Sequence, residues 1–147
     1  MQQNLHSILI EAQPKDVFPQ ILLWGESKWW PKNSQMKFIR ETPGEIKIGT
    51  RYLQRVLLPL APQWEVEVNI IEPGKKVGRK FLNGIFSGVE WVELEPVVGL
   101  TKVKYIMNFE VNGILNRGLW NLFFRRLHDR NLEVILANLR DFIVNKK

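Results

Sequence analysis

The sequence has no cysteine and, in 147 residues, only two histidines, His6 and His128. The lack of cysteine excludes a disulfide framework, a thiolate metal site and a cysteine nucleophile. The sequence also lacks a His-rich metal pattern, a glycine-rich phosphate loop and a nucleophile elbow. We therefore expect neither a metal nor a cofactor, and the signatures of most enzyme classes are absent.

Long apolar runs are absent as well. No run approaches the ~20 residues that a membrane-spanning helix needs. The first residues include the polar Gln2, Gln3 and Asn4, and they lack the basic region and apolar core of a signal peptide. We expect a cytoplasmic protein, a location that also agrees with the lack of cysteine. The length fits one domain that spans residues 1–147.

The charge is unbalanced, with a formal net charge of +6 and a pI near 9.7. The segment from Asn112 to Lys147 has seven basic and three acidic residues, so +4 of this charge lies there. No nucleic-acid-binding motif accompanies it, and basic charge alone indicates weak attraction to anionic partners. We expect no specific nucleic acid and at most weak peripheral contact with an anionic membrane surface. The sequence does not determine the oligomeric state.

The N-terminal part predicts a strand followed by a helix. Alternating apolar residues predict a strand at Leu5–Glu11. Pro14 suits the first turn of a helix, Pro19 should bend that helix, and Gly25 should end it. A short second helix is expected at Ser27–Trp30. The apolar face of the first helix comprises Val17, Phe18, Ile21 and Leu22.

Six further β-type runs follow, separated by turn residues. Asn83-Gly84 is the strongest two-residue hairpin signal, and it follows a run that begins after Pro73-Gly74. The other turn signals are Pro43-Gly44, Pro59 with Pro62, Gly99, and Asn112-Gly113. The remaining runs are Met36–Thr42, Thr50–Leu58, Gln63–Glu72, Ile85–Glu95 and Leu100–Val111. Strands joined by such short turns are antiparallel, because parallel strands need long crossovers.

The C-terminal segment, from about Asn116 to Val144, should form a long amphipathic helix. Its two apolar stripes lie well over 90° apart around the helix and change over near His128. The first stripe comprises Leu119, Trp120, Phe123, Phe124 and Leu127, and the second comprises Leu132, Ile135, Leu136, Leu139, Phe142 and Ile143. Either the helix bends there or its first half meets different neighbours, such as a loop over a cavity mouth. We favour plain packing over a mobile gate.

These elements predict an α+β fold, in which a curved antiparallel seven-stranded sheet wraps around the long C-terminal helix and one or two short helices follow the first strand. Alternation assigns the inner face of the sheet. The inner residues include Tyr52, Gln54 and Val56 in the second of the six runs, Trp64, Val66, Val68 and Ile70 in the third, Phe86, Gly88, Glu90, Val92 and Leu94 in the fifth, and Val103, Tyr105, Met107, Phe109 and Val111 in the last. The acidic Glu90 is unusual on such a face.

Four stretches of the chain resemble the helix-grip superfamily called START-like or SRPBCC. They are Ile10–Phe18, Lys28–Pro31, Trp91–Pro96 with Gly99–Thr101, and the closing amphipathic helix. The superfamily includes polyketide cyclase/dehydrase and lipid-transport proteins and the pollen-allergen ligand binders. The resemblance implies a cavity between sheet and helix for an apolar small molecule such as a lipid, sterol, polyketide or aromatic compound.

The inner face supplies aromatic and polarizable walls for such a cavity, which we expect to be mostly apolar and larger than ordinary packing voids. The candidate ligand-binding residues are Tyr52, Trp64, Val66, Val68, Phe86, Glu90, Val92, Tyr105, Met107, Phe109 and Phe123. Each of them can equally be core filling. Our first hypothesis is therefore a module that binds or transports a small apolar molecule.

The second hypothesis is an enzyme of the cyclase/dehydrase kind that acts on a polyketide-like substrate. Glu90, with Tyr105 or Tyr52, is the candidate acid/base group. We expect His128 to be a surface or boundary residue. If Glu90 is buried without a cation such as Arg79, the substitution Glu90→Gln should stabilise the fold. A third hypothesis is a chaperone-interaction module of the same fold that uses its basic exterior.

Overall fold

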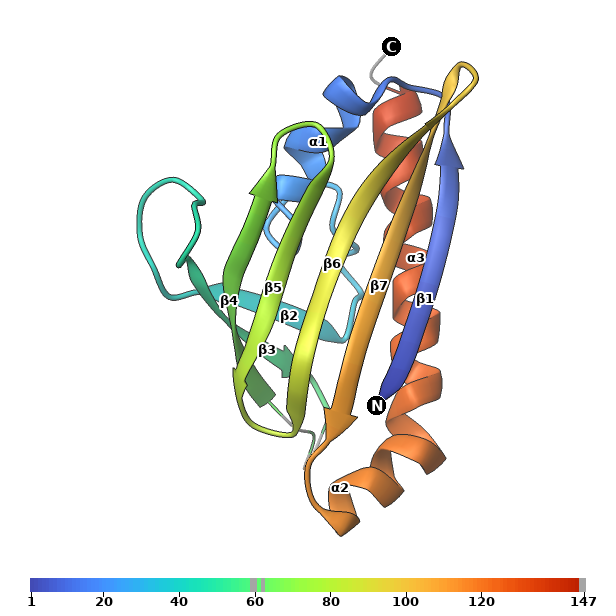
Figure 1. The fold of residues 1–147 in the computed structure, drawn as a ribbon. Helices are drawn as coiled ribbons and strands as arrows, with labels where there is room; N and C mark the ends of the chain where they lie inside the picture. The colour runs from blue at the N-terminus through green and yellow to red at the C-terminus, as the bar shows by residue number, and fades with distance from the viewer. Residues whose placement is uncertain (59–60, 62, 146–147) are drawn as a thin grey trace.

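A single antiparallel sheet, with one long helix across its concave face, forms the body of the molecule (Figure 1). The computed structural model describes residues 1–58, 61 and 63–145. The strands are β1 (Gln2–Ile10), β2 (Met36–Arg40), β3 (Arg51–Val56), β4 (Gln63–Glu72), β5 (Lys76–Asn83), β6 (Phe86–Val97) and β7 (Leu100–Val111). The helices are α1 (Pro14–Leu22), α2 (Ile114–Leu119), a π-helical turn η1 (Trp120–Phe124) and α3 (Arg125–Asn145).

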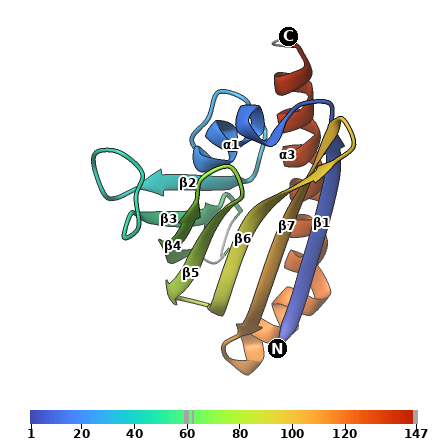
Figure 2. The same ribbon diagram turned by 45° about the horizontal axis from the view of Figure 1, so that its top comes forward.

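The strand order is β1-β7-β6-β5-β4-β3-β2, and each neighbouring pair is antiparallel. Figure 2 shows β2 and β3 turned away from β7 and β1, so that the sheet curls around the helix. The helix α1 lies at one end of the concave side, close to α3. The predicted fold class is confirmed, because all seven strands, the helix after β1 and the long C-terminal helix are present.

Local irregularities give the sheet its curvature. The β4–β5 pair shifts register between Glu65 and Val66 and again between Val68 and Ile70, and such bulges increase twist. Gly88 in β6 has a φ of 130°, and a Cβ atom there would lie 2.1 Å from the carbonyl oxygen of Asn108. Only glycine therefore allows β6 to approach β7 so closely at this point.

The predicted inner face of the sheet is confirmed, because nearly all of its side chains are buried. On β4 these are Trp64, Val66 and Val68, and β7 contributes Val103, Tyr105 and Met107 among others. Ile70 is only partly buried, since it follows the second register shift of β4. The core is closed from the helix side by Leu132, Ile135, Leu136, Leu139 and Ile143 of α3.

Several predicted boundaries differ from the structure. Ser27–Trp30 forms turns rather than a helix, and α1 runs from Pro14 to Leu22 with Pro19 inside it. The strands β2 and β3 are shorter than the predicted Met36–Thr42 and Thr50–Leu58, because a ten-residue loop replaces a tight hairpin between them. The predicted break at Pro59 and Pro62 lies outside the described residues.

The C-terminal segment is helical from Ile114 to Asn145, but it is interrupted by η1. A π-helical turn holds about one residue more than an α-helical turn, so it rotates the following residues by about 100° relative to the preceding ones. This insertion explains why the two apolar stripes do not align, and Figure 1 shows that the axis of α2 diverges from that of α3. In the part of the chain that the structure describes, no helix has the length and apolar character needed to cross a membrane.

Candidate functional site

Glu90 lies at the centre of a buried polar cluster on the concave face of the sheet. Its residue is only 3% exposed, and its direct neighbours in the sheet are Arg79 on β5 and Met107 on β7. The hydroxyl of Tyr105 donates to Glu90 Oε2 at 2.6 Å, and Gln54 Nε2 donates to Oε1 at 2.9 Å. The predicted register of β6, which placed Glu90 inside, is therefore correct.

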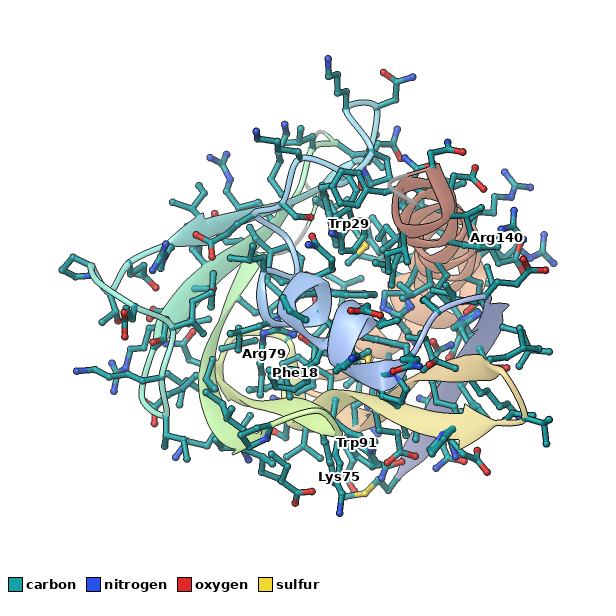
Figure 3. All side chains as sticks on the ribbon, turned by 90° about the horizontal axis from the view of Figure 1, so that it is seen from above. Phe18, Trp29, Lys75, Arg79, Trp91 and Arg140 are labelled. Carbon is teal, nitrogen blue, oxygen red and sulfur yellow. The ribbon has the colours of Figure 1, made fainter. Side chains whose placement is uncertain are left out.

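Arg79 supplies the cation beside this carboxylate. Its Nη1 atom lies 3.9 Å from Glu90 Oε1, and the side chain of Arg79 is 1% exposed. The guanidinium also stands over two aromatic rings, 5.8 Å from the centroids of Phe38 and Tyr52, at a distance where cation–π attraction operates. Figure 3 shows Arg79 within the curve of the sheet, whereas Lys75 lies on its outside. Arg79 and Glu90 thus form a buried pair of opposite charges at the centre of the cluster.

The donors of Arg79 are incompletely used. Its Nε and Nη1 atoms are buried and have no hydrogen-bond partner among the described residues, since 3.9 Å is too long for a hydrogen bond to Glu90. Buried donors in native proteins are normally paired with protein or ordered water. This site therefore has hydrogen-bonding capacity left for a water molecule or a bound group.

His128 connects the cluster to the C-terminal helix. Its Nε2 atom lies 3.5 Å from the hydroxyl oxygen of Tyr105, so that hydroxyl stands between Glu90 and His128. Burial lowers the pKa of His128 from 6.5 to about 4, so the imidazole is neutral near pH 7. Burial, together with the neighbouring Glu90, raises the pKa of Tyr105 well above 10.0, so its hydroxyl keeps its proton.

Two further polar groups tie the structure together at the edges of this cluster. The hydroxyl of Tyr52 and the Nε atom of Arg40 both donate to Glu26, at 2.9 and 2.8 Å. Burial raises the pKa of Tyr52, so this side chain acts as a donor. Tyr52 thus bonds to Glu26 in the loop after α1 and not to Glu90.

Asp129 forms the second group, with Asn4 and His6 of β1 at 2.7 and 3.0 Å. Burial acts to raise the pKa of Asp129, but the hydrogen bonds from Asn4 and His6 outweigh that effect and lower it. This pairing joins the beginning of α3 to the edge strand, and it places Asp129 beside the buried His128.

An apolar cavity lies between the sheet and the start of the helix. Its volume is about 20 Å³, which is room for about one water molecule. The lining residues come from four strands and from the η1–α3 junction, and they are Met36, Val56, Trp64, Phe86, Trp120, Phe124, Leu127, His128 and Asn131. His128 belongs both to this wall and to the polar cluster, so the two features adjoin.

The cavity lies where the sequence placed it, but the prediction that it exceeds ordinary packing voids is wrong for this space. Aromatic rings fill the region, because Phe86 makes edge contacts with Trp64, Phe109 and Trp120 at centroid distances of 4.9, 5.6 and 5.1 Å. Such edge-to-face packing is favourable, so little free volume remains. A larger occupant needs some of these rings to move.

The predicted ligand-binding residues lie in the core, with one exception, but most of them do not line the cavity. Ten of them are buried inside the sheet: Tyr52, Trp64, Val66, Val68, Phe86, Glu90, Val92, Tyr105, Met107 and Phe109. Trp64 and Phe86 line the cavity itself. Phe123 is 59% exposed and points away from the core, because η1 turns Trp120 inward instead.

Sequence reasoning undervalued three members of the cluster. Arg79 was expected only as a possible partner of Glu90, yet it shares the inward face of β5 with Val77 and Phe81, two residues away on either side. Gln54 was placed inward but given no role. His128 was expected at the surface or at a boundary, but it is buried, with 7% exposed. The signal was its spacing of four residues from Leu132. Among residues 1–58, 61 and 63–145, no group of three His, Asp or Glu side chains could hold a metal ion.

Comparison with known proteins supports the fold through structure alone. No protein-family model and no curated sequence matches the chain. The structure of TTHA0849 from Thermus thermophilus is similar, with a TM-score of 0.75, 16% identity and 99% of each chain covered. A norcoclaurine synthase variant from Thalictrum flavum has a TM-score of 0.74, with 10% identity over 99% of this chain and 95% of that one.

The Aha1 dimer from Colwellia psychrerythraea is a further neighbour, with a TM-score of 0.67 and 18% identity over 97% of this chain and 96% of that one. These proteins have different names and share only the architecture at such low identity, so the likeness concerns the fold. The chain therefore has the helix-grip fold.

Proposed function

We propose that this protein binds a small, mostly apolar molecule between the sheet and the C-terminal helix. The molecule would be a lipid, sterol, polyketide or aromatic compound. The observation that carries the proposal is the contact between an apolar cavity and a buried polar cluster, through His128. Apolar walls with a few convergent polar groups are the usual composition of small-molecule sites. The norcoclaurine synthase neighbour, which holds a transition-state analogue, supports the capacity of this fold for small molecules.

The residues divide the task of binding between them. Trp64 and Phe86 provide flat apolar surfaces, while the His128 imidazole and the Tyr105 hydroxyl can orient a polar group of the ligand. The cavity holds about 20 Å³, so binding must displace side chains. Trp120 and Phe124 are the candidates, because they come from the irregular η1 turn, and π-helical turns are frequent at functional sites.

Mass spectrometry of an organic extract from the purified protein is the first test. A co-purifying apolar compound is expected, enriched over an extract from the same purification of cells that do not express the protein. Titration with fatty acids, sterols and flavonoids should change tryptophan emission, and Trp64→Phe should reduce that change while a Trp91→Phe control keeps it. No extracted compound and no spectral response across all three classes would contradict ligand binding.

A second function is favoured by one specific observation, the 2.6 Å hydrogen bond between Tyr105 and Glu90. A carboxylate, a protonated phenol and a neutral imidazole in succession can move a proton, which is what a cyclase/dehydrase-type enzyme needs. Tyr105→Phe should then abolish turnover of a polyketide-like substrate while binding persists. If binding and turnover fall together, Tyr105 only positions the ligand. The third hypothesis, chaperone interaction, has the fold and the basic exterior in its favour, and it predicts that little compound is extracted.

A further inference from the structure

The segment from Ile114 to Phe123 exposes a continuous row of large apolar side chains. The exposed fractions are 85% for Ile114, 76% for Leu115, 42% for Leu119, 81% for Leu122 and 59% for Phe123. We call these five residues the apolar face of α2–η1. Single exposed leucines are ordinary on protein surfaces, whereas a contiguous cluster marks an interaction site.

The spacing shows that these residues form one face. Ile114, Gly118 and Leu122 are four residues apart along the helix, and Leu115, Leu119 and Phe123 form the adjacent row. Side chains four apart lie above one another on a helix, so the two rows make a single stripe. Trp120 and Phe124, also four apart, line the cavity instead. One short segment thus presents its inner side to the core and its outer apolar side to solvent.

The charged residues between Val111 and His128 are all positive. Arg117, Arg125 and Arg126 are exposed, and no Asp or Glu occurs between Val111 and His128. The nearest acidic side chain along the chain, Glu110, lies 3.8 Å from the N-terminal ammonium group. The apolar face is therefore bordered by arginines, and its local charge complements an anionic surface.

The segment is also placed for contact. Figures 1 and 2 show α2 at the end of the molecule, beyond the last residues of β7 and opposite the β6–β7 hairpin. The segment therefore lies at one end of the molecule, where a flat partner can approach it.

We propose that the apolar face of α2–η1 docks on an anionic lipid bilayer. The Leu, Ile and Phe side chains would enter the boundary between headgroups and acyl chains, while the arginines would stay at the level of the anionic headgroups. Pairing with a second copy through the same face fits the charges less well, since a two-fold interface would bring the two arginine groups together. This inference goes beyond the proposed function, because docking requires no ligand in the cavity.

Co-sedimentation of the full chain with vesicles tests the proposal. The protein should bind vesicles of phosphatidylcholine with 25% phosphatidylserine, bind much less to phosphatidylcholine alone, and release at high salt. Leu122→Ser/Phe123→Ser should weaken binding at least tenfold, since each side chain loses its burial in lipid. The matched control is Val97→Ser/Val98→Ser at the β6–β7 hairpin, where Val98 is 100% exposed, and it should leave binding unchanged.

Charge is tested separately. Arg125→Ala/Arg126→Ala should weaken binding to the anionic vesicles about thirtyfold. This is roughly the loss in affinity expected when two basic residues near an anionic surface are removed. Lys32→Ala/Lys75→Ala, at exposed positions elsewhere, is the control and should have a much smaller effect.

Circular dichroism and thermal melting of every variant show whether it is folded. Absence of binding to the anionic vesicles, or equal loss in the Val97/Val98 control, would overturn the proposal. So would a lipid-free dimer that Leu122→Ser/Phe123→Ser converts to a monomer in light-scattering measurements, because the face would then serve self-association.

Discussion

In α3, Leu132, Ile135 and Leu139 are almost completely buried, whereas in the preceding α2–η1 segment Leu115, Leu122 and Phe123 are exposed to solvent. Both stretches have apolar residues at helical spacing, and both belong to one continuous helical region. They differ in what lies opposite them. The concave sheet covers α3 along its length, while α2 extends past the end of β7 (Figure 1).

This difference teaches that apolar periodicity identifies a face but not the partner of that face. In α3 the partner is the sheet of the same chain. In α2–η1 the inward side is used by Trp120, which is 3% exposed, and the π-helical turn leaves a second apolar side outward. Substitution of the buried residues should therefore lower the free energy of unfolding far more than substitution of the exposed apolar residues.

Trp120→Ala should have the largest effect on stability. Trp120 is the buried residue of the α2–η1 segment, and its ring contacts Phe86, Phe109 and His128. Removal should lower the free energy of unfolding by about 3–5 kcal/mol in urea denaturation. A loss below about 1 kcal/mol would mean that the segment is not anchored to the core, and the contrast with α3 would then extend to the whole segment.

Leu139→Ala should cost about 2–5 kcal/mol, because the side chain is fully buried between α3 and the sheet. The measurement is again urea denaturation, with the slope compared to exclude a change in the denatured state. An effect as small as that of an exposed leucine would contradict the assignment of α3 as the helix gripped by the sheet.

Glu90→Gln tests the buried pair of Glu90 and Arg79 on the concave face of the sheet. The sequence allowed stabilisation if Glu90 were buried without a cation, but Arg79 lies 3.9 Å away. The neutral amide would leave Arg79 as an uncompensated buried charge, so we expect a loss of about 2–3 kcal/mol. This is less than for complete removal of a partner, because the amide oxygen still accepts from Tyr105. The double variant Arg79→Met/Glu90→Gln should recover part of the loss, and an unchanged or raised melting temperature of Glu90→Gln alone would contradict the pairing.

The pH dependence tests the junction between the two stretches, at His128. Because burial lowers the pKa of His128 from 6.5 to about 4, the unfolded chain takes up this proton first as the pH falls. The stabilisation is fully present above the unfolded-state pKa of 6.5 and should be lost as the pH falls to 4, by about 3 kcal/mol. His128→Gln should show a shallower decline over this range. The control is His6→Gln, which removes the other histidine and should keep the decline of the wild type. Identical profiles for the wild type and His128→Gln would contradict a buried neutral imidazole.

Leu122→Ala should have the smallest effect, within about 0.5 kcal/mol, because the side chain is 81% exposed. Leu122→Ala and Leu139→Ala make the same chemical change. The difference between their losses of stability therefore compares the exposed segment with the buried helix directly. A cost above about 1.5 kcal/mol would show that the apolar face of α2–η1 is already covered in solution.

Much of the fold followed from the sequence. Turn residues such as Asn83-Gly84 separate alternating runs, so the strands, their antiparallel order and the inward position of Glu90 could be predicted from periodicity. Alternation is a local property, and it survives in the structure wherever the ladder is regular. It failed at Ile70, which follows a register shift, because the sequence does not mark where bulges occur.

The tertiary structure alone decided how the inward groups combine. Nothing local in the sequence shows that Gln54 of β3 reaches Glu90 of β6, because β4 and β5 lie between these strands and the curl of the sheet brings the two side chains together. Arg79 and Tyr105 lie on the adjacent strands β5 and β7, and the pairing of those strands with β6 sets their distance from Glu90. Likewise, the helical spacing predicted an amphipathic segment but placed Phe123 in the cavity. Trp120 lies inside and Phe123 outside because the π-helical turn and the end of the sheet set the rotation and the cover of the helix, and both depend on contacts distant in sequence.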